Sequence, residues 1–128
     1  MSRFTLDHLH IRSADPDTAA KFYVDALDAK IVSRAPMEDR IRVVLDLGGL
    51  SLFLETVPAS TPTPPPPPFR GIEHIGLAVA DIDAVMASVM DGHGAVLVKG
   101  VTQARPGVRI AFFDSPEGVR VELIERSS

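Results

Sequence analysis

Residues 6–32 read LDHLHIRSADPDTAAKFYVDALDAKIV, and residues 72–98 read IEHIGLAVADIDAVMASVMDGHGAVLV. The two stretches align without a gap at a shift of 66 residues, and seven of the 27 aligned pairs are identical, His8 and His74 among them. Many other pairs exchange one aliphatic residue for another, as Leu9 and Ile75 do. Similarity of this length within one chain indicates an internal duplication. The sequence therefore predicts two related modules.

Both modules predict the order strand, helix and three strands. An aspartate before each helical pattern, Asp15 or Asp81, provides the N-cap, and Pro16 suits the first helical position. The second helix is expected to bury Ile82, Val85, Met86, Val89 and Met90. Alternation predicts strands at 4–12, 30–34, 40–46, 50–57, 72–79, 95–99, 108–113 and 119–125. The expected fold class is α+β: two tandem βαβββ modules, each a mixed sheet with its helix outside.

The length of 128 residues fits one domain, in which module one spans 4–57, a linker spans 58–70 and module two spans 71–126. Residues 58–68 hold seven of the eleven prolines, five of them consecutive. Such a segment adopts the polyproline II conformation and acts as a semi-rigid spacer. A proline-motif ligand for a partner domain is the alternative.

Composition argues against several classes of partner. Thirteen basic and seventeen acidic residues give a net charge of -4, and no basic run would follow a nucleic-acid backbone. There is no cysteine, so a metal would be held by nitrogen and oxygen atoms. The start of the chain shows no apolar signal region, and no run approaches transmembrane length. We expect a cytoplasmic protein without a membrane or nucleic-acid partner.

Two pairs of residues could carry chemistry: His8 with Glu55, and His74 with Glu122. Strand alternation places all four side chains on the face opposite the helix. Two carboxylates that are buried together need a compensating cation, so we predict a divalent metal held by these four residues. Two imidazoles and two carboxylates suit Zn, Ni, Co, Mn or Fe. Aligning the two modules at a shift of 67 residues places Glu55 opposite Glu122. Aligning Gly49 with Gly118 instead places Phe53 opposite Glu122.

Other side chains on the same faces are candidates for binding substrate. They are His10, Arg12, Phe53 and Arg120. His10 could also serve as a proton shuttle or as ordinary polar lining. The two arginines could hold a substrate carboxylate.

Three segments resemble the vicinal oxygen chelate superfamily, which includes glyoxalases, bleomycin-resistance proteins and dioxygenases. They are 6–11 (LDHLHI), 72–77 (IEHIGL) and 114–125 (DSPEGVRVELIE). The resemblance implies that the paired βαβββ modules form a cup-shaped, barrel-like mixed sheet, with the helices outside, around a divalent metal, usually in a homodimer. His8, His74 and Glu122 match its ligand positions. With Glu55 the pattern is closest to glyoxalase I and methylmalonyl-CoA epimerase, and without it the pattern is similar to extradiol dioxygenases and fosfomycin-modifying enzymes.

The resemblance and the repeated ligands predict a glyoxalase-like, metal-dependent lyase or isomerase. Proton transfer next to a carbonyl would pass through an enediolate that the metal stabilises, with Glu122 or Glu55 as the base. The substrate would be a small molecule such as a thioester or dicarbonyl. The alternatives are an extradiol-type dioxygenase with iron or manganese on His8, His74 and Glu122, a metal-free ligand-binding protein and a metal-free isomerase.

Overall fold

The computed structural model describes residues 2–127, which form two compact units, one up to Thr61 and one from Pro62 onward. The boundary lies within the proline-rich linker. Residues 57–74 form neither helix nor strand, and residues 58–73 are exposed throughout. Within the part of the chain that the structure describes, neither helix has the length and apolar character needed to cross a membrane.

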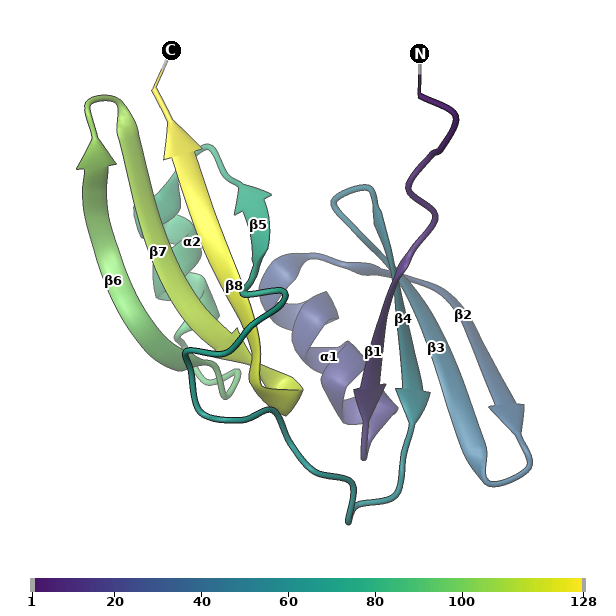
Figure 1. Cartoon of the computed structure of the whole chain (residues 1–128). Helices are drawn as coiled ribbons and strands as arrows, with labels where there is room; N and C mark the ends of the chain where they lie inside the picture. Colours follow the sequence, from purple (N-terminus) through teal and green to yellow (C-terminus); the bar gives the residue numbers. More distant parts are fainter. Residues whose placement is uncertain (1, 128) are drawn as a thin grey trace. The chain divides into compact units, whose positions relative to one another are not determined.

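Module one contains one helix and a four-stranded mixed sheet. Its elements are β1 (Leu9–Ser13), α1 (Pro16–Leu27), β2 (Lys30–Met37), β3 (Arg40–Leu47) and β4 (Leu50–Thr56). The strand order is β1-β4-β3-β2, with β1 parallel to β4 and the other neighbours antiparallel. Helix α1 covers one face of this sheet (Figure 1). The opposite face carries the candidate functional residues of module one.

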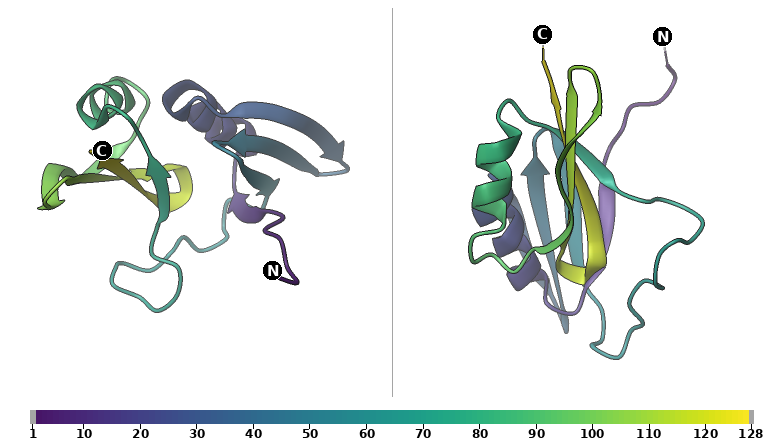
Figure 2. Two further views of the ribbon diagram at one scale, coloured as in Figure 1. Left: turned by 90° about the horizontal axis from the view of Figure 1, so that it is seen from above. Right: turned by 90° about the vertical axis from the view of Figure 1, so that its left-hand side faces the viewer.

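Module two repeats this architecture. Its elements are β5 (Ile75–Ala78), α2 (Ile82–Val89), β6 (Val96–Arg105), β7 (Val108–Ser115), the short 3-10 helix η1 (Pro116–Gly118) and β8 (Val119–Arg126). The strand order β5-β8-β7-β6 is that of module one, and α2 lies against one face of the sheet (Figure 2). The predicted α+β fold of two βαβββ modules is confirmed.

Each module buries an apolar core between its helix and its sheet. In module one, Tyr23 of α1 is fully buried, as are the core leucines of β3 and β4, and in module two Ile82 and Val89 of α2 are fully buried, as are Phe113 of β7 and Val121 of β8. The two caps form as predicted: Asp15 accepts a hydrogen bond from the backbone N–H of Thr18, and Asp81 accepts one from Ala84. The strand residues that alternate with the core therefore point away from the helix.

Some predicted boundaries were wrong. Strand β1 begins at Leu9 instead of Phe4, and β5 begins at Ile75 instead of Ile72, because a strand extends only as far as its partner, β4 or β8, pairs with it. Strand β6 continues to Arg105 along β7. Met90 is 36% exposed, because α2 ends at Val89 and Met90 is only its C-cap.

Candidate metal centre

Module two brings His74 and Glu122 together at one end of its sheet. His74 directly precedes β5, and Glu122 lies on the parallel neighbour β8, where it pairs with Gly76. Nε2 of His74 lies 3.4 Å from Oε1 of Glu122, while Nδ1 lies 2.9 Å from Oε1 of Glu73. The His74 and Glu122 side chains are 31% and 18% exposed. A nitrogen and a carboxylate oxygen thus converge at a partly solvent-accessible position.

Module one positions His8 in the same way. Nδ1 of His8 lies 2.6 Å from Oδ2 of Asp7, the residue that precedes it. Its ring stacks on Phe53, with ring centroids 4.0 Å apart and planes 4° from parallel. A histidine that donates its Nδ1–H to a carboxylate presents Nε2 as a lone-pair donor, which is the arrangement found around metal-ligating histidines.

These two half-sites fit the chemistry of a borderline divalent cation, because each offers an oriented imidazole. Neither module alone contains a complete set of metal-ligating side chains. Among residues 2–127, no group of three or more histidine, aspartate or glutamate side chains is gathered as a metal site. His74 and Glu122 are the pair that the structure itself brings together.

The strand registers give Glu122 a counterpart other than Glu55. Leu9 pairs with Leu52 in module one, and its equivalent Ile75 pairs with Val121 in module two. Phe53 therefore occupies the position of Glu122. The strand pairing therefore agrees with the alignment of Gly49 with Gly118. Glu55 was predicted as ligand and base because it was aligned with Glu122, and the strand pairing does not support that alignment.

Glu55 is instead engaged by arginines. Nε and Nη2 of Arg42 donate to Oε2 of Glu55 at 2.8 and 2.6 Å, and Nη1 of Arg40 lies 3.6 Å from Oε1. The hydrogen bonds from Arg42, supported by the charges of Arg40 and His10, hold the pKa of Glu55 below its usual value. A carboxylate with a lowered pKa is a weaker base.

The predicted substrate-binding residues lie in two separate groups. In module one, the His10 ring centroid is 6.3 Å from that of Phe53, and Arg12 pairs with Glu55 across β1 and β4. In module two, Arg120 is half-buried and its Nε donates to Oδ1 of Asp114 at 3.0 Å.

Module two also contains a cavity of about 960 Å³. It is lined by linker residues 63–69 together with Glu73, Asp114, Glu117, Gly118 and Arg120. Glu73 therefore both orients His74 and lines the cavity. Sequence reasoning missed this residue and its counterpart Asp7, although the shift of 66 aligns them as a conserved acid before each histidine.

Comparisons with known proteins agree with this architecture. Residues 5–123 match the family model described as Glyoxalase/Bleomycin resistance protein/Dioxygenase superfamily. The uncharacterized protein YaeR of Escherichia coli K12 is 29% identical over 126 residues, covering 93% of this chain and 94% of YaeR.

Solved structures share the fold. A glyoxalase family protein from Bacillus cereus superposes with a TM-score of 0.79 at 22% identity, covering 100% of this chain and 99% of that one. A V278E mutant of glyoxalase I from Zea mays gives a TM-score of 0.75 at 20% identity, covering 94% of this chain and 44% of that one. The chain thus spans less than half of the maize protein.

Proposed function

The chain belongs to the Glyoxalase/Bleomycin resistance protein/Dioxygenase superfamily, and from this membership we propose a metal-dependent enzyme whose small substrate carries two adjacent oxygen atoms. The observation that supports it best is the shared orientation of His8 and His74, each bonded through Nδ1 to the acidic residue before it. We assign the metal to Nε2 of both histidines and to Glu122. Zn, Ni, Co, Mn and Fe all suit this ligand set.

The proposed set has three protein ligands and omits Glu55. The carboxylate of Glu55 is engaged by Arg42 and Arg40, and Phe53, which has no ligand atom, stands at the position equivalent to Glu122. Three ligands leave more positions open for substrate oxygens than four would.

For the reaction, we propose proton transfer next to a carbonyl, as in a lyase or isomerase acting on a thioester or dicarbonyl. A bound divalent cation would supply Lewis acidity to the two substrate oxygens. Glu122 would remove the neighbouring proton and return it, because the strand register provides no second carboxylate to share the task. His74, held by Glu73, would keep its orientation throughout.

A second reaction is favoured by the three-ligand set itself. Two histidines and one carboxylate form the facial arrangement used by non-heme iron oxygenases. An extradiol-type dioxygenase is therefore the alternative function. A homodimer and a cytoplasmic location stay predictions, and light scattering would test the first.

Elemental analysis of the untagged protein tests the ligand assignment. We expect stoichiometric divalent metal in the wild type, loss of the metal in His74→Ala, and full retention in the matched control Glu55→Gln. Retention in His74→Ala would refute the assignment, and loss in Glu55→Gln would restore a fourth ligand.

Activity assays then separate the two reactions. We expect the wild type to exchange a substrate proton next to a carbonyl for deuterium. Glu122→Gln should abolish this exchange while its circular dichroism spectrum stays unchanged. Oxygen consumption with catechols after loading with iron would favour the dioxygenase instead. Wild-type exchange rates in Glu122→Gln would exclude Glu122 as the base.

A further inference from the structure

We propose that three arginines on the open face of module one, Arg12, Arg40 and Arg42, form a subsite for an oxyanion, a carboxylate or phosphate group carried by the substrate. We name these residues the arginine cluster. That the anion belongs to a substrate rests on the proposed function. The subsite itself rests on the geometry of module one.

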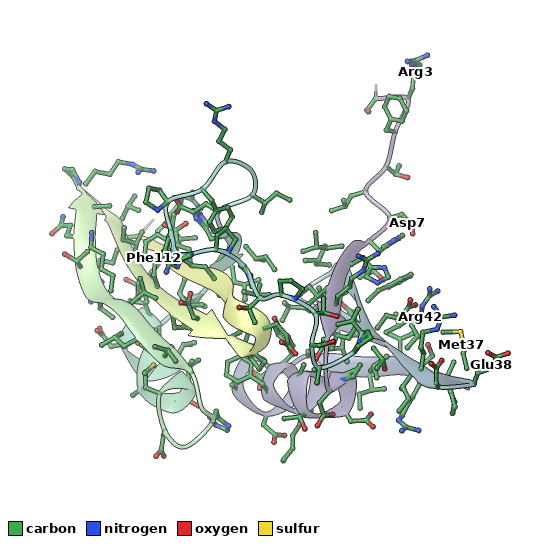
Figure 3. All side chains as sticks on the ribbon, turned by 60° about the horizontal axis from the view of Figure 1, so that its bottom comes forward. Arg3, Asp7, Met37, Glu38, Arg42 and Phe112 are labelled. Atoms are coloured by element: carbon green, nitrogen blue, oxygen red, sulfur yellow. The ribbon has the colours of Figure 1, made fainter. Side chains whose placement is uncertain are left out.

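Three adjacent strands assemble the arginine cluster around one carboxylate. Arg12 of β1 pairs with Glu55 of β4, and Glu55 pairs on its other side with Arg42 of β3. Arg40 lies two residues before Arg42 on the same face, with Nη1 3.6 Å from Oε1 of Glu55. Figure 3 shows Arg42 on the β2–β3 hairpin, whose end carries Met37 and Glu38.

The cluster carries more positive charge than Glu55 can neutralise. Arg42 is committed to Glu55 through two hydrogen bonds. Arg40 is 54% exposed, and among residues 2–127 no carboxylate other than Glu55 lies at ion-pair distance from Arg40, and none from Arg12. Two guanidinium groups, those of Arg40 and Arg42, thus share the Glu55 carboxylate, and Arg12 adds a third positive charge on the neighbouring strand position. Guanidinium N–H groups match the paired oxygens of carboxylate and phosphate groups.

Module two shows that the fold does not require these charges. By strand register, the positions of the arginine cluster and Glu55 correspond to apolar residues of module two, namely Ala78, Val108, Ile110 and Ile124. The same βαβββ architecture forms there without a single charge at these positions. The cluster is therefore specific to module one, as a ligand subsite would be.

Phe53 links the arginine cluster to the proposed metal ligand His8. Its ring stacks on His8 with centroids 4.0 Å apart, and Cζ of Arg42 lies 5.4 Å from the same ring centroid. One aromatic ring thus contacts both groups. A small substrate could place its reacting oxygens near His8 while an anionic group at its other end reaches the arginines.

Calorimetric titration of the full chain with inorganic phosphate, and separately with acetate, tests the subsite. We expect saturable binding in the wild type and in His74→Ala, which lacks one of the two proposed metal ligands of module two. The tighter of the two probes identifies the class of oxyanion. Arg12→Ala combined with Arg40→Ala should weaken binding about tenfold or more, because charge-assisted hydrogen bonds are lost while the Arg42–Glu55 pair remains.

Two further variants sharpen the result. Glu55→Gln removes the internal competitor and should tighten binding, whereas Arg105→Ala should change nothing, because Arg105 is an exposed arginine on β6 of module two. The inference is overturned if the double variant, folded by circular dichroism, binds like the wild type, or if His74→Ala abolishes binding. Metal analysis is independent of this test, so failure of the metal assignment would leave an arginine-dependent subsite standing.

Discussion

Phe53 and Glu122 occupy the same strand position in the two modules, and this single difference is the reason that we propose three protein ligands for the metal and not four. The side chain of Phe53 offers His8 a flat surface to stack on, whereas Glu122 offers His74 an oxygen at 3.4 Å. Each histidine also has an acidic residue on its Nδ1. The duplicated feature is therefore the oriented imidazole, and the carboxylate that we propose as a ligand has no equivalent at this strand position in module one.

The residue that orients His74 provides a prediction at this scale. Glu73→Gln should weaken metal binding about 10–100-fold, because a hydrogen-bonded carboxylate fixes the ring and raises the basicity of Nε2. Competition with a chelating dye measures the affinity. The exposed acid Asp91 supplies the control, since Asp91→Asn lowers the charge of the same module equally. Equal affinities in the two variants would mean that Glu73 acts only through its charge.

At the scale of elements, Glu125 joins helix α2 to its sheet. Its Oε2 accepts the backbone N–H of Ile82 at 2.9 Å, and Arg109 holds both carboxylate oxygens while also donating to Asp83. The hydrogen bonds from Arg109, followed by that from Ile82, lower the pKa of Glu125 below its usual value of 4.5. The first turn of α2 is thus fixed by a strand residue from the far end of the chain.

This lowered pKa predicts a pH dependence of stability. A group with a depressed folded-state pKa contributes stability above its unfolded-state value, and loses that contribution as the pH falls through the folded-state value. Unfolding by urea at pH 7 and at steps below pH 4.5 should show wild-type stability falling more steeply than that of Glu125→Gln. Asp91→Asn, remote from this contact, should follow the wild type. Parallel curves for Glu125→Gln and wild type would show that the carboxylate contributes nothing.

Local patterns predicted the elements but not the register between the modules. Caps and alternation depend on neighbouring residues, so both helices and every strand were found from the sequence. The equivalence of Phe53 with Glu122 depends on how many residues the preceding strands and turns contain in each module. Strand β6 is two residues longer than β2 and contains three register shifts, and η1 adds one residue between β7 and β8 compared with Gly48-Gly49. The sequence alone left two alignments open, one with Glu55 and one with Phe53 opposite Glu122, and only the strand pairing decides between them.

At the scale of the whole molecule, the two modules share a fold and differ in chemistry. Each module has a phenylalanine ring beside its histidine, but module one adds arginines, whereas module two adds a carboxylate and a cavity. In our proposals, the first recognises a substrate anion and the second contributes most of the metal ligands. In this proposal, the duplication produced two modules with the same fold whose sheet faces acquired different functions. The difference becomes visible only when the strands of the two modules are aligned by their pairing.

The proline-rich linker supplies the last prediction. Pro64 lies against η1, close enough that a methyl group added to Gly118 would sit 3.8 Å from its ring, and residues 64–68 wall the cavity. Replacing these five residues by alternating Gly and Ser should lower the free energy of unfolding by up to about 0.4–1 kcal/mol per residue, because proline restricts the unfolded chain. Metal content should stay at the wild-type level, since no proposed ligand lies in the segment. Urea unfolding followed by circular dichroism, with Pro62→Ser outside the cavity wall as the control, measures the effect. Unchanged stability would show that the linker is no more ordered in the folded protein than a flexible spacer, and its prolines would then have no structural role in module two.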